Sequence, residues 1–153
     1  MPQESGPVLN DAGGQARAAR RPRLLAWCEA GAGPEAGRGG SGWSLVAGNG
    51  REFARSASLY RTDGELGEAL RELWADRRAL HYLVLKSQGR FWSWTAHLPG
   101  RSSGVREGAA IARSARTYLR QDQCRMGMAG FPDALEQVRR TDWDALLKGP
   151  RQR

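Results

Sequence analysis

The clearest periodic pattern in the chain is an apolar stripe at helical spacing. Apolar side chains recur at intervals of three and four residues, at Leu66, Ala69, Leu70, Leu73 and Trp74. This spacing places them on one face of an α-helix. The preceding Thr62-x-x-Glu65 has the spacing of a capping box, which satisfies free N–H groups at a helix start. We therefore expect an amphipathic helix that begins after Thr62.

Three shorter segments before this helix have the patterns of β-strands. Residues 24–29 form an apolar run, residues 42–47 alternate with Trp43, Leu45 and Ala47 on one face, and residues 52–60 follow. Gly48-Asn49-Gly50 between the last two supplies residues that tolerate a positive φ, as a tight hairpin requires. Residues 31–42 hold six glycines and a proline, which predicts a long loop.

The second half of the chain repeats this order of elements more weakly. Strands are expected at 80–87, 90–97 and 109–119, followed by a helix over 121–131 that Pro132 ends. Two glycines inside that helix each cost about 1 kcal/mol relative to alanine. A short helix over 133–140 and another with Thr141 as its N-cap are expected to follow.

Two sequence blocks recur in the same order in both halves. Residues 53–60 (FARSASLY) and 111–118 (IARSARTY) share five of eight positions at an offset of 58. Residues 43–47 (WSLVA) match 92–96 (WSWTA) at an offset of 49, and the loops on either side compensate in length. Loops change length more readily than strands, so we interpret the chain as two diverged copies of one unit.

The stretch WSLVAGNGREFARSASLYRTDGELGEAL resembles the YegP-like domain of unknown function. The matching positions of the first copy are Leu45, Ala47, Asn49, Gly50, Ser56, Tyr60, Ala69 and Leu70. In the second copy Ala96, Ser114 and Tyr118 match, and His97-Leu-Pro-Gly100 replaces the Asn-Gly turn. The resemblance covers about residues 24–135. It implies tandem β-β-β-α repeats with helices on an antiparallel sheet, and it implies no activity.

The expected fold is therefore α+β, an antiparallel sheet with helices packed on one face and short C-terminal helices. Residues 23–78 and 79–135 are the two β-β-β-α repeats, and residues 136–153 are a helical extension. Residues 1–22 are rich in Arg and Gly and nearly lack large apolar side chains. Such a segment cannot bury enough surface to offset chain entropy, so we expect a disordered tail.

The net charge of +8 is concentrated in the second half, where residues 81–153 hold 13 basic and six acidic side chains. A basic balance favours an anionic partner. Only Lys86 and Lys148 are lysines, however, and an Arg-, Ala- and Gly-rich composition is also typical of a GC-rich coding sequence. The charge alone therefore does not distinguish a functional from a compositional origin.

Cysteine usage and hydropathy indicate a cytoplasmic protein. Cys28 and Cys124 lack the spacing of a disulfide framework or a metal site, and we expect both to be buried free thiols. No apolar run is long enough to cross a bilayer, and the N-terminus lacks the apolar region of a secretory signal. We expect no contact with a membrane.

Residues suited to catalysis are scarce. His81 and His97 lie at the ends of expected strands, without a neighbouring cysteine or carboxylate cluster. Gly48-Asn49-Gly50 lacks the following Gly-Lys-Ser/Thr of a phosphate-binding loop. The acids of the first helix have the spacing of a solvated face that pairs with Arg71, Arg77 and Arg78. We expect no enzyme, cofactor or metal.

Two binding functions remain. The tryptophans are expected to lie mostly in the core, and Arg55 and Arg113 then project from equivalent places on the opposite face of the sheet. The leading hypothesis is a protein-interaction module that binds another protein or self-associates through a sheet face or an edge strand. The alternative is weakly sequence-specific binding of nucleic acid, with help from the N-terminal arginines, by Arg55, Arg90, Arg113, Arg116 and Arg120.

Overall fold

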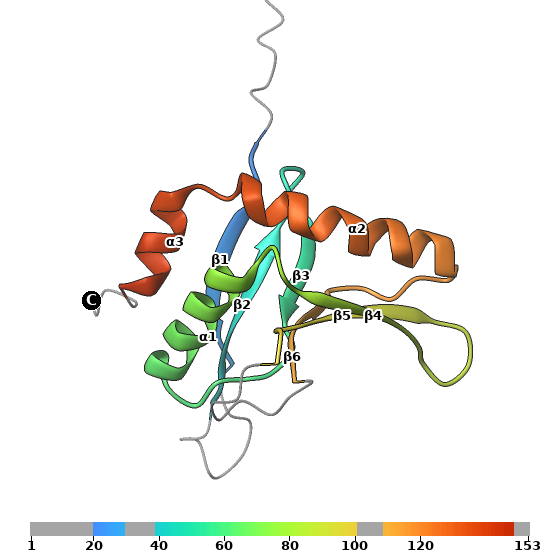
Figure 1. The fold of residues 1–153 in the computed structure, drawn as a ribbon, viewed down its shortest axis with the longest axis horizontal. Coiled ribbons are helices and arrows are strands. Elements are labelled where there is room, and N and C mark those ends of the chain that lie inside the picture. Colours follow the sequence, from blue (N-terminus) through green and yellow to red (C-terminus); the bar gives the residue numbers. More distant parts are fainter. Residues whose placement is uncertain (1–19, 30–38, 101–108, 149–153) are drawn as a thin grey trace, which may run out of the picture.

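The structure, a computed structural model, describes residues 20–29, 39–100 and 109–148. The chain runs β-β-β-α-β-β-β-α-α (Figure 1). Its elements are β1 (Arg23–Cys28), β2 (Ser41–Val46), β3 (Glu52–Ser56), α1 (Asp63–Asp76), β4 (His81–Lys86), β5 (Trp92–His97), β6 (Ala110–Ser114), α2 (Gln121–Gln137) and α3 (Arg140–Leu147). Nearly all of the expected tail and most of the expected glycine-rich loop lie outside the described residues.

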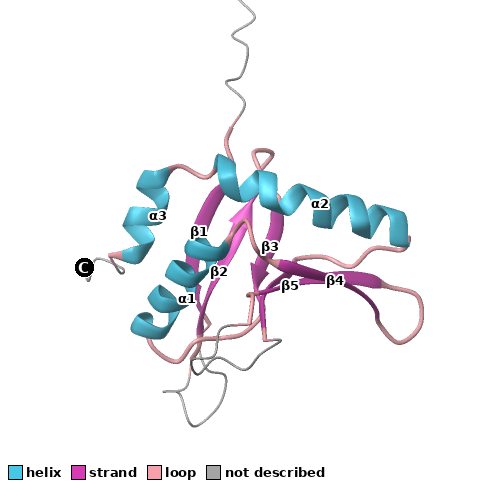
Figure 2. Ribbon diagram, in the orientation of Figure 1, coloured by secondary structure: helices cyan, strands magenta, loops and turns pink. Residues whose placement is uncertain are grey.

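The six strands form one antiparallel sheet in the order β1-β2-β3-β6-β5-β4. The α+β class and the antiparallel sheet are thereby confirmed. Strands β3 and β6 meet at the centre of the sheet, while β1 and β4 are its edges. Helix α1 packs on β2, α2 packs on β5 and β4, and α3 packs on α1 and β1. Figure 2 shows the helices as a layer against the sheet, with α3 and the β4–β5 hairpin at opposite ends of the molecule.

We call the face of the sheet that points away from the helices the outer face. One row of directly paired residues crosses all six strands on this face. The row runs Leu25, Ser44, Arg55, Arg113, Thr95, Leu83. From either edge the order is leucine, hydroxyl, arginine. The two arginines face each other across the β3–β6 junction, at the centre of the sheet.

Both central strands contain a bulge at corresponding places. The register shifts between Leu45 and Val46 opposite β3, and between Ala96 and His97 opposite β6. Each shift leaves one extra residue, Phe53 in β3 and Ile111 in β6. A bulge of this kind turns two successive side chains toward one face. Phe53 and Ala54 consequently both pack toward the core.

Two buried serines accept hydrogen bonds from the backbone of β2 and β5 in the same way. The Trp43 N–H donates to Ser56 Oγ at 3.2 Å, and the Trp94 N–H donates to Ser114 Oγ at 3.3 Å. Trp94, and not Trp92, therefore has the surroundings of Trp43, and the expected offset of 49 between these strands is wrong by two residues. Side chains alternate with a period of two, so the sequence pattern is the same in both registers.

The core lies between the helices and the inner face of the sheet. Trp43, Trp94 and Trp143 are fully buried. The ring of Trp94 lies 5.0 Å from that of Phe131 in α2 and 6.3 Å from that of Phe53. These indoles fill the space between the layers, as the sequence pattern indicates.

Helix α1 begins as the capping box predicts. Thr62 Oγ1 accepts a hydrogen bond from the Glu65 N–H at 3.1 Å, and the apolar stripe from Leu66 to Leu73 is buried. The Glu65 carboxylate, however, accepts from the Arg61 N–H at 2.9 Å instead of from Thr62. The helix start is therefore a variant of the expected box.

Helix α2 does not end at Pro132 but continues to Gln137. The prediction of a separate helix over 133–140 is wrong. An internal proline removes a hydrogen bond and costs about 3 kcal/mol in an isolated helix. Here Phe131 and Leu135, on either side of the proline, are both fully buried, and their burial offsets this cost. Helix α3 then begins at Arg140 with Arg139 as its N-cap, two residues before the expected N-cap Thr141.

The end of α1 is joined to α2 by an ion-pair cluster. Glu136 Oε1 accepts from Arg77 Nε at 3.0 Å and from Arg78 Nε at 2.8 Å. Arg77 also stacks on the Trp74 ring, with its Cζ 3.8 Å from the centroid. The prediction that these arginines pair with acids of their own helix is wrong, because the fold brings a carboxylate of α2 closer.

Candidate functional site

A chain of hydrogen bonds runs across the first half of the outer face. Trp27 Nε1 donates to Ser44 Oγ at 2.8 Å, and Ser44 Oγ donates to Glu52 Oε1 at 2.7 Å. Arg55 donates to the other oxygen of Glu52 at 2.6 Å. The Trp27 side chain is therefore bound to β2, and Glu52 is the centre of the network.

Glu52 compensates the charge at the middle of the outer face. Arg55 and Arg113 are direct cross-strand partners, and like charges in this position destabilise a sheet. Burial by itself raises the pKa of Glu52, but hydrogen bonds from Ser44 and Arg55 and the charges of Arg55 and Arg113 together hold that pKa below its ordinary value. The carboxylate therefore stays ionised and binds Arg55, while Arg113 remains exposed.

We expect Glu52→Gln to lower the free energy of unfolding at pH 7, with a smaller effect in acid. A carboxyl whose pKa is lowered by folding stabilises the protein above its unfolded-state pKa, and this contribution is lost as the pH falls through the folded-state pKa. Urea denaturation of both proteins at about pH 7 and about pH 3 measures the difference. Glu68→Gln on the exposed face of α1 is the control, and an equal effect of Glu52→Gln at both pH values would contradict the role of the carboxylate.

His81 and His97, 16 residues apart in sequence, are direct partners on the outer face of β4 and β5. The His97 ring lies 2.9 Å from Thr95 Oγ1. Within the described part of the chain, no cluster of three or more His, Cys, Asp or Glu side chains is arranged to hold a metal ion. The pair therefore has no third ligand among the described residues.

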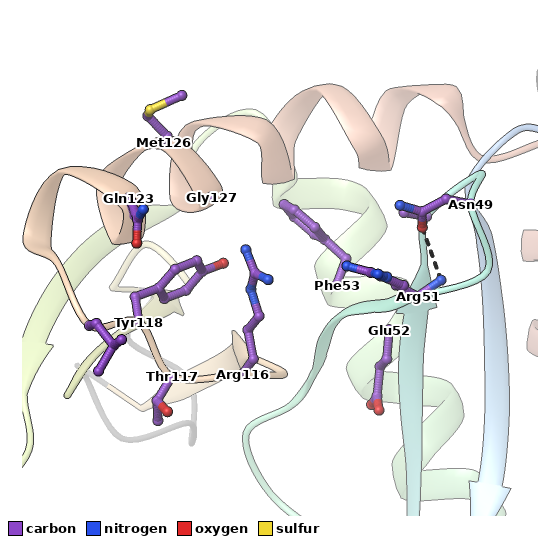
Figure 3. A pocket seen from close by; sticks show the side chains of 12 residues that line it. Asn49, Arg51, Glu52, Phe53, Arg116, Thr117, Tyr118, Gln123, Met126 and Gly127 are labelled. Atoms are coloured by element: carbon purple, nitrogen blue, oxygen red, sulfur yellow. Dashed lines mark hydrogen bonds between the residues drawn. The ribbon is translucent and has the colours of Figure 1, made fainter.

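A groove lies on the other side of the β3–β6 region, under the first turns of α2 (Figure 3). Its volume is about 680 Å³. The turn between β2 and β3, the connection from β6 to α2, and α2 itself contribute its walls. Its lining residues are Ala47, Asn49, Arg51, Glu52, Phe53, Arg116, Thr117, Tyr118, Leu119, Gln123, Met126 and Gly127.

Polar groups converge on this groove from different elements. Figure 3 shows the side chains of Arg51 and Arg116 pointing into the space between Asn49 and Tyr118, with the Gln123 amide turned toward it from α2. Arg116 stacks on Tyr118, with its Cζ 4.7 Å from the ring centroid. Glu52 points away from the groove, toward its partners on the outer face. The groove interior is therefore cationic.

The five arginines predicted to bind anions divide among several places. Arg55 and Arg113 lie on the outer face, and Arg116 lines the groove. Arg120 pairs with Asp122 at 3.2 Å at the start of α2, and Arg90 lies in the exposed turn between β4 and β5. Arg51 of the groove was missed, because a lone arginine after a Gly-Asn-Gly turn has no sequence signal of binding.

The two cysteines have different environments. Both are free, with Cys124 buried and Cys28 exposed at the end of β1, so the prediction that both are buried is wrong for Cys28. Its place in the apolar run of an edge strand does not bring it under a helix. Burial raises the pKa of Cys124, partly countered by Arg125. Cys124 is thus a protonated core residue.

Strand β4 carries the most exposed leucines of the sheet. Leu83 and Leu85 are 51% and 45% exposed on the outer face, and Leu25 of β1 is 44% exposed. The next outward residue of β1 is Trp27, which is hydrogen-bonded to Ser44 and half-buried. The edge at β4 therefore presents two free apolar side chains where the edge at β1 presents one.

No family model, curated protein or solved structure matches this chain. The resemblance to YegP-like domains stays a prediction. Among the described residues, no helix has the length and apolar character needed to cross a membrane.

Proposed function

We propose that this protein is an interaction module that self-associates through the edge strand β4. The observation that carries the proposal is the pair of exposed leucines, Leu83 and Leu85, on a strand with one unpaired side. An edge strand offers a row of free backbone N–H and C=O groups to another strand. Pairing with a second copy would satisfy these groups and bury the leucines together.

The sequence of β4 is self-complementary in antiparallel pairing. With Val84 on the two-fold axis, Leu83 of each copy lies opposite Leu85 of the other, on the outer face. Tyr82 then lies opposite Lys86, so no two like charges face each other. Directly opposite side chains of antiparallel strands are the pairs that stabilise a sheet. An interface formed by one strand of six residues in each copy is small, so we expect a weak dimer.

The same kind of antiparallel strand pairing already exists inside the chain, between β3 and β6. We infer that the two halves are diverged β-β-β-α repeats of one unit, in agreement with the resemblance to YegP-like domains. The matching bulges at Phe53 and Ile111, and the matching bonds of Ser56 and Ser114, support this inference. The halves meet by antiparallel pairing of β3 with β6. Antiparallel pairing of β4 with β4 of a second copy would extend the sheet in the same way.

Other modes of association have less support. Face-to-face packing of two outer faces would bring the exposed Arg113 side chains of both copies together, and like charges at an interface oppose binding. Binding of nucleic acid along the outer face has less support because Arg55 is already hydrogen-bonded to Glu52. The edge of β4 avoids both difficulties.

We expect the wild-type protein to form dimers in sedimentation equilibrium at concentrations up to about 100 µM. The double variant Leu83→Lys/Leu85→Lys is expected to be monomeric, because lysines on an edge strand prevent pairing. Leu25→Lys on β1 is the matched control and should leave the dimer intact. A monomeric wild type over this range, or equal disruption by the control, would refute the proposal.

A further inference from the structure

The two arginines of the groove, unlike several arginines of the sheet and helices, have no carboxylate partner among the described residues. Arg55, Arg77, Arg78 and Arg120 each pair with an acid. In the described residues, Arg51 and Arg116 make no ion pair, and the one carboxylate of the groove lining, Glu52, points to the outer face. Two guanidinium groups without an acidic partner therefore face one open groove.

Hydrogen bonds hold the backbone on both sides of the groove. The Arg51 N–H donates to Asn49 Oδ1 at 3.0 Å, and Gly50 adopts a φ of +82°, which glycine tolerates without strain. On the other side, Tyr118 is paired through its backbone with Trp92, at 2.7 and 2.8 Å. The Tyr118 ring is buried against Gly127 of α2, and Arg116 stacks on it.

We propose that the groove binds the phosphate group of a small organic phosphate monoester. Guanidinium groups recognise phosphate through charge-assisted, bidentate hydrogen bonds. Tyr118 and Gln123 add neutral donors on the α2 side, and the positive end of the α2 dipole adds to the attraction. A volume of about 680 Å³ exceeds that of a phosphate ion and suits a small organic molecule.

The apolar part of the ligand would lie against Phe53. This ring is half-buried between β3 and α2 and forms the wall between the two arginines. An aromatic ester group can stack on this ring and on a guanidinium plane. The geometry thus favours an aryl phosphate over inorganic phosphate, and both over the same ring without phosphate.

The test is isothermal titration calorimetry at low ionic strength with three probes, phenyl phosphate, inorganic phosphate and phenol. We expect phenyl phosphate to bind most tightly and phenol not to bind. Arg51→Gln and Arg116→Gln should each lower the affinity for phenyl phosphate by about tenfold or more. Arg90→Gln, the same change in the exposed β4–β5 turn, should leave its affinity unchanged.

Three results would overturn the proposal. The first is that neither phosphate produces heat of binding at millimolar concentration. The second is that phenol binds as tightly as phenyl phosphate. The third is that Arg90→Gln loses as much affinity for phenyl phosphate as the groove variants do. Tighter binding of inorganic phosphate than of phenyl phosphate would overturn the assignment of an ester. None of the residues that line the groove belongs to β4, so its occupancy can be measured whether or not the chain dimerises.

Discussion

Trp94→Ala is expected to lower the free energy of unfolding by about 3–5 kcal/mol. The Trp94 side chain is fully buried, and its ring contacts those of Phe53, Tyr82 and Phe131. Truncation removes these contacts and leaves a cavity between the sheet and α2. Because a domain of this size is stable by only about 5–15 kcal/mol, much of the protein should unfold at modest urea concentrations. Urea denaturation followed by circular dichroism measures the change.

Trp94→Phe provides the matched control. It keeps an aromatic ring in the same space, and the indole N–H that it removes has no hydrogen-bond partner among the residues that the structure describes. We therefore expect Trp94→Phe to lower the free energy of unfolding clearly less than Trp94→Ala does. This variant also keeps the test informative if Trp94→Ala does not fold. Equal losses for the two variants would show that the ring does not fill this space.

Gly127→Ala is expected to destabilise the protein by about 2 kcal/mol, although alanine is the better helix former. A Cβ at this position of α2 would overlap the hydroxyl of Tyr118 and lie 2.8 Å from its Cζ. The Tyr118 ring cannot withdraw easily, because its backbone is paired with Trp92. Thermal unfolding of the variant and the wild type measures the change.

Gly67→Ala in α1 is the same substitution with the opposite expected sign. The atoms nearest to an added Cβ there belong to the Arg71 guanidinium, at 3.7 Å, which is ordinary contact with a flexible group. The helix propensity of alanine should then raise the free energy of unfolding by about 1 kcal/mol. Stabilisation by both substitutions would show that Gly127 is not required beside Tyr118.

Local patterns predicted most elements of this fold. The apolar stripe and Thr62 determine α1, because periodicity and capping act within one or two turns. The alternation around Trp43 and Trp94 placed both indoles in the core. The same logic was wrong at Pro132, where burial of Phe131 and Leu135 outweighs the local cost of an internal proline, and at Cys28, which lies exposed at the end of the edge strand β1.

The arrangement of the strands could not be read in this way. A two-residue shift leaves the inward and outward pattern unchanged, so the sequence placed Trp92 where the hydrogen bonds place Trp94. The groove was missed for a related reason. Arg51 and Arg116 lie 65 positions apart, and they face one space only because β3 pairs with β6 and α2 crosses above them.

By itself, the sequence determined the types of element, their order, and the division of side chains between core and surface, since these depend on neighbours three or four positions away. Only the tertiary structure decided which strands are edges, which arginines have carboxylate partners, and which face Arg113 shares with Leu83. These features depend on contacts between residues distant in sequence, and such contacts follow from how the whole chain packs.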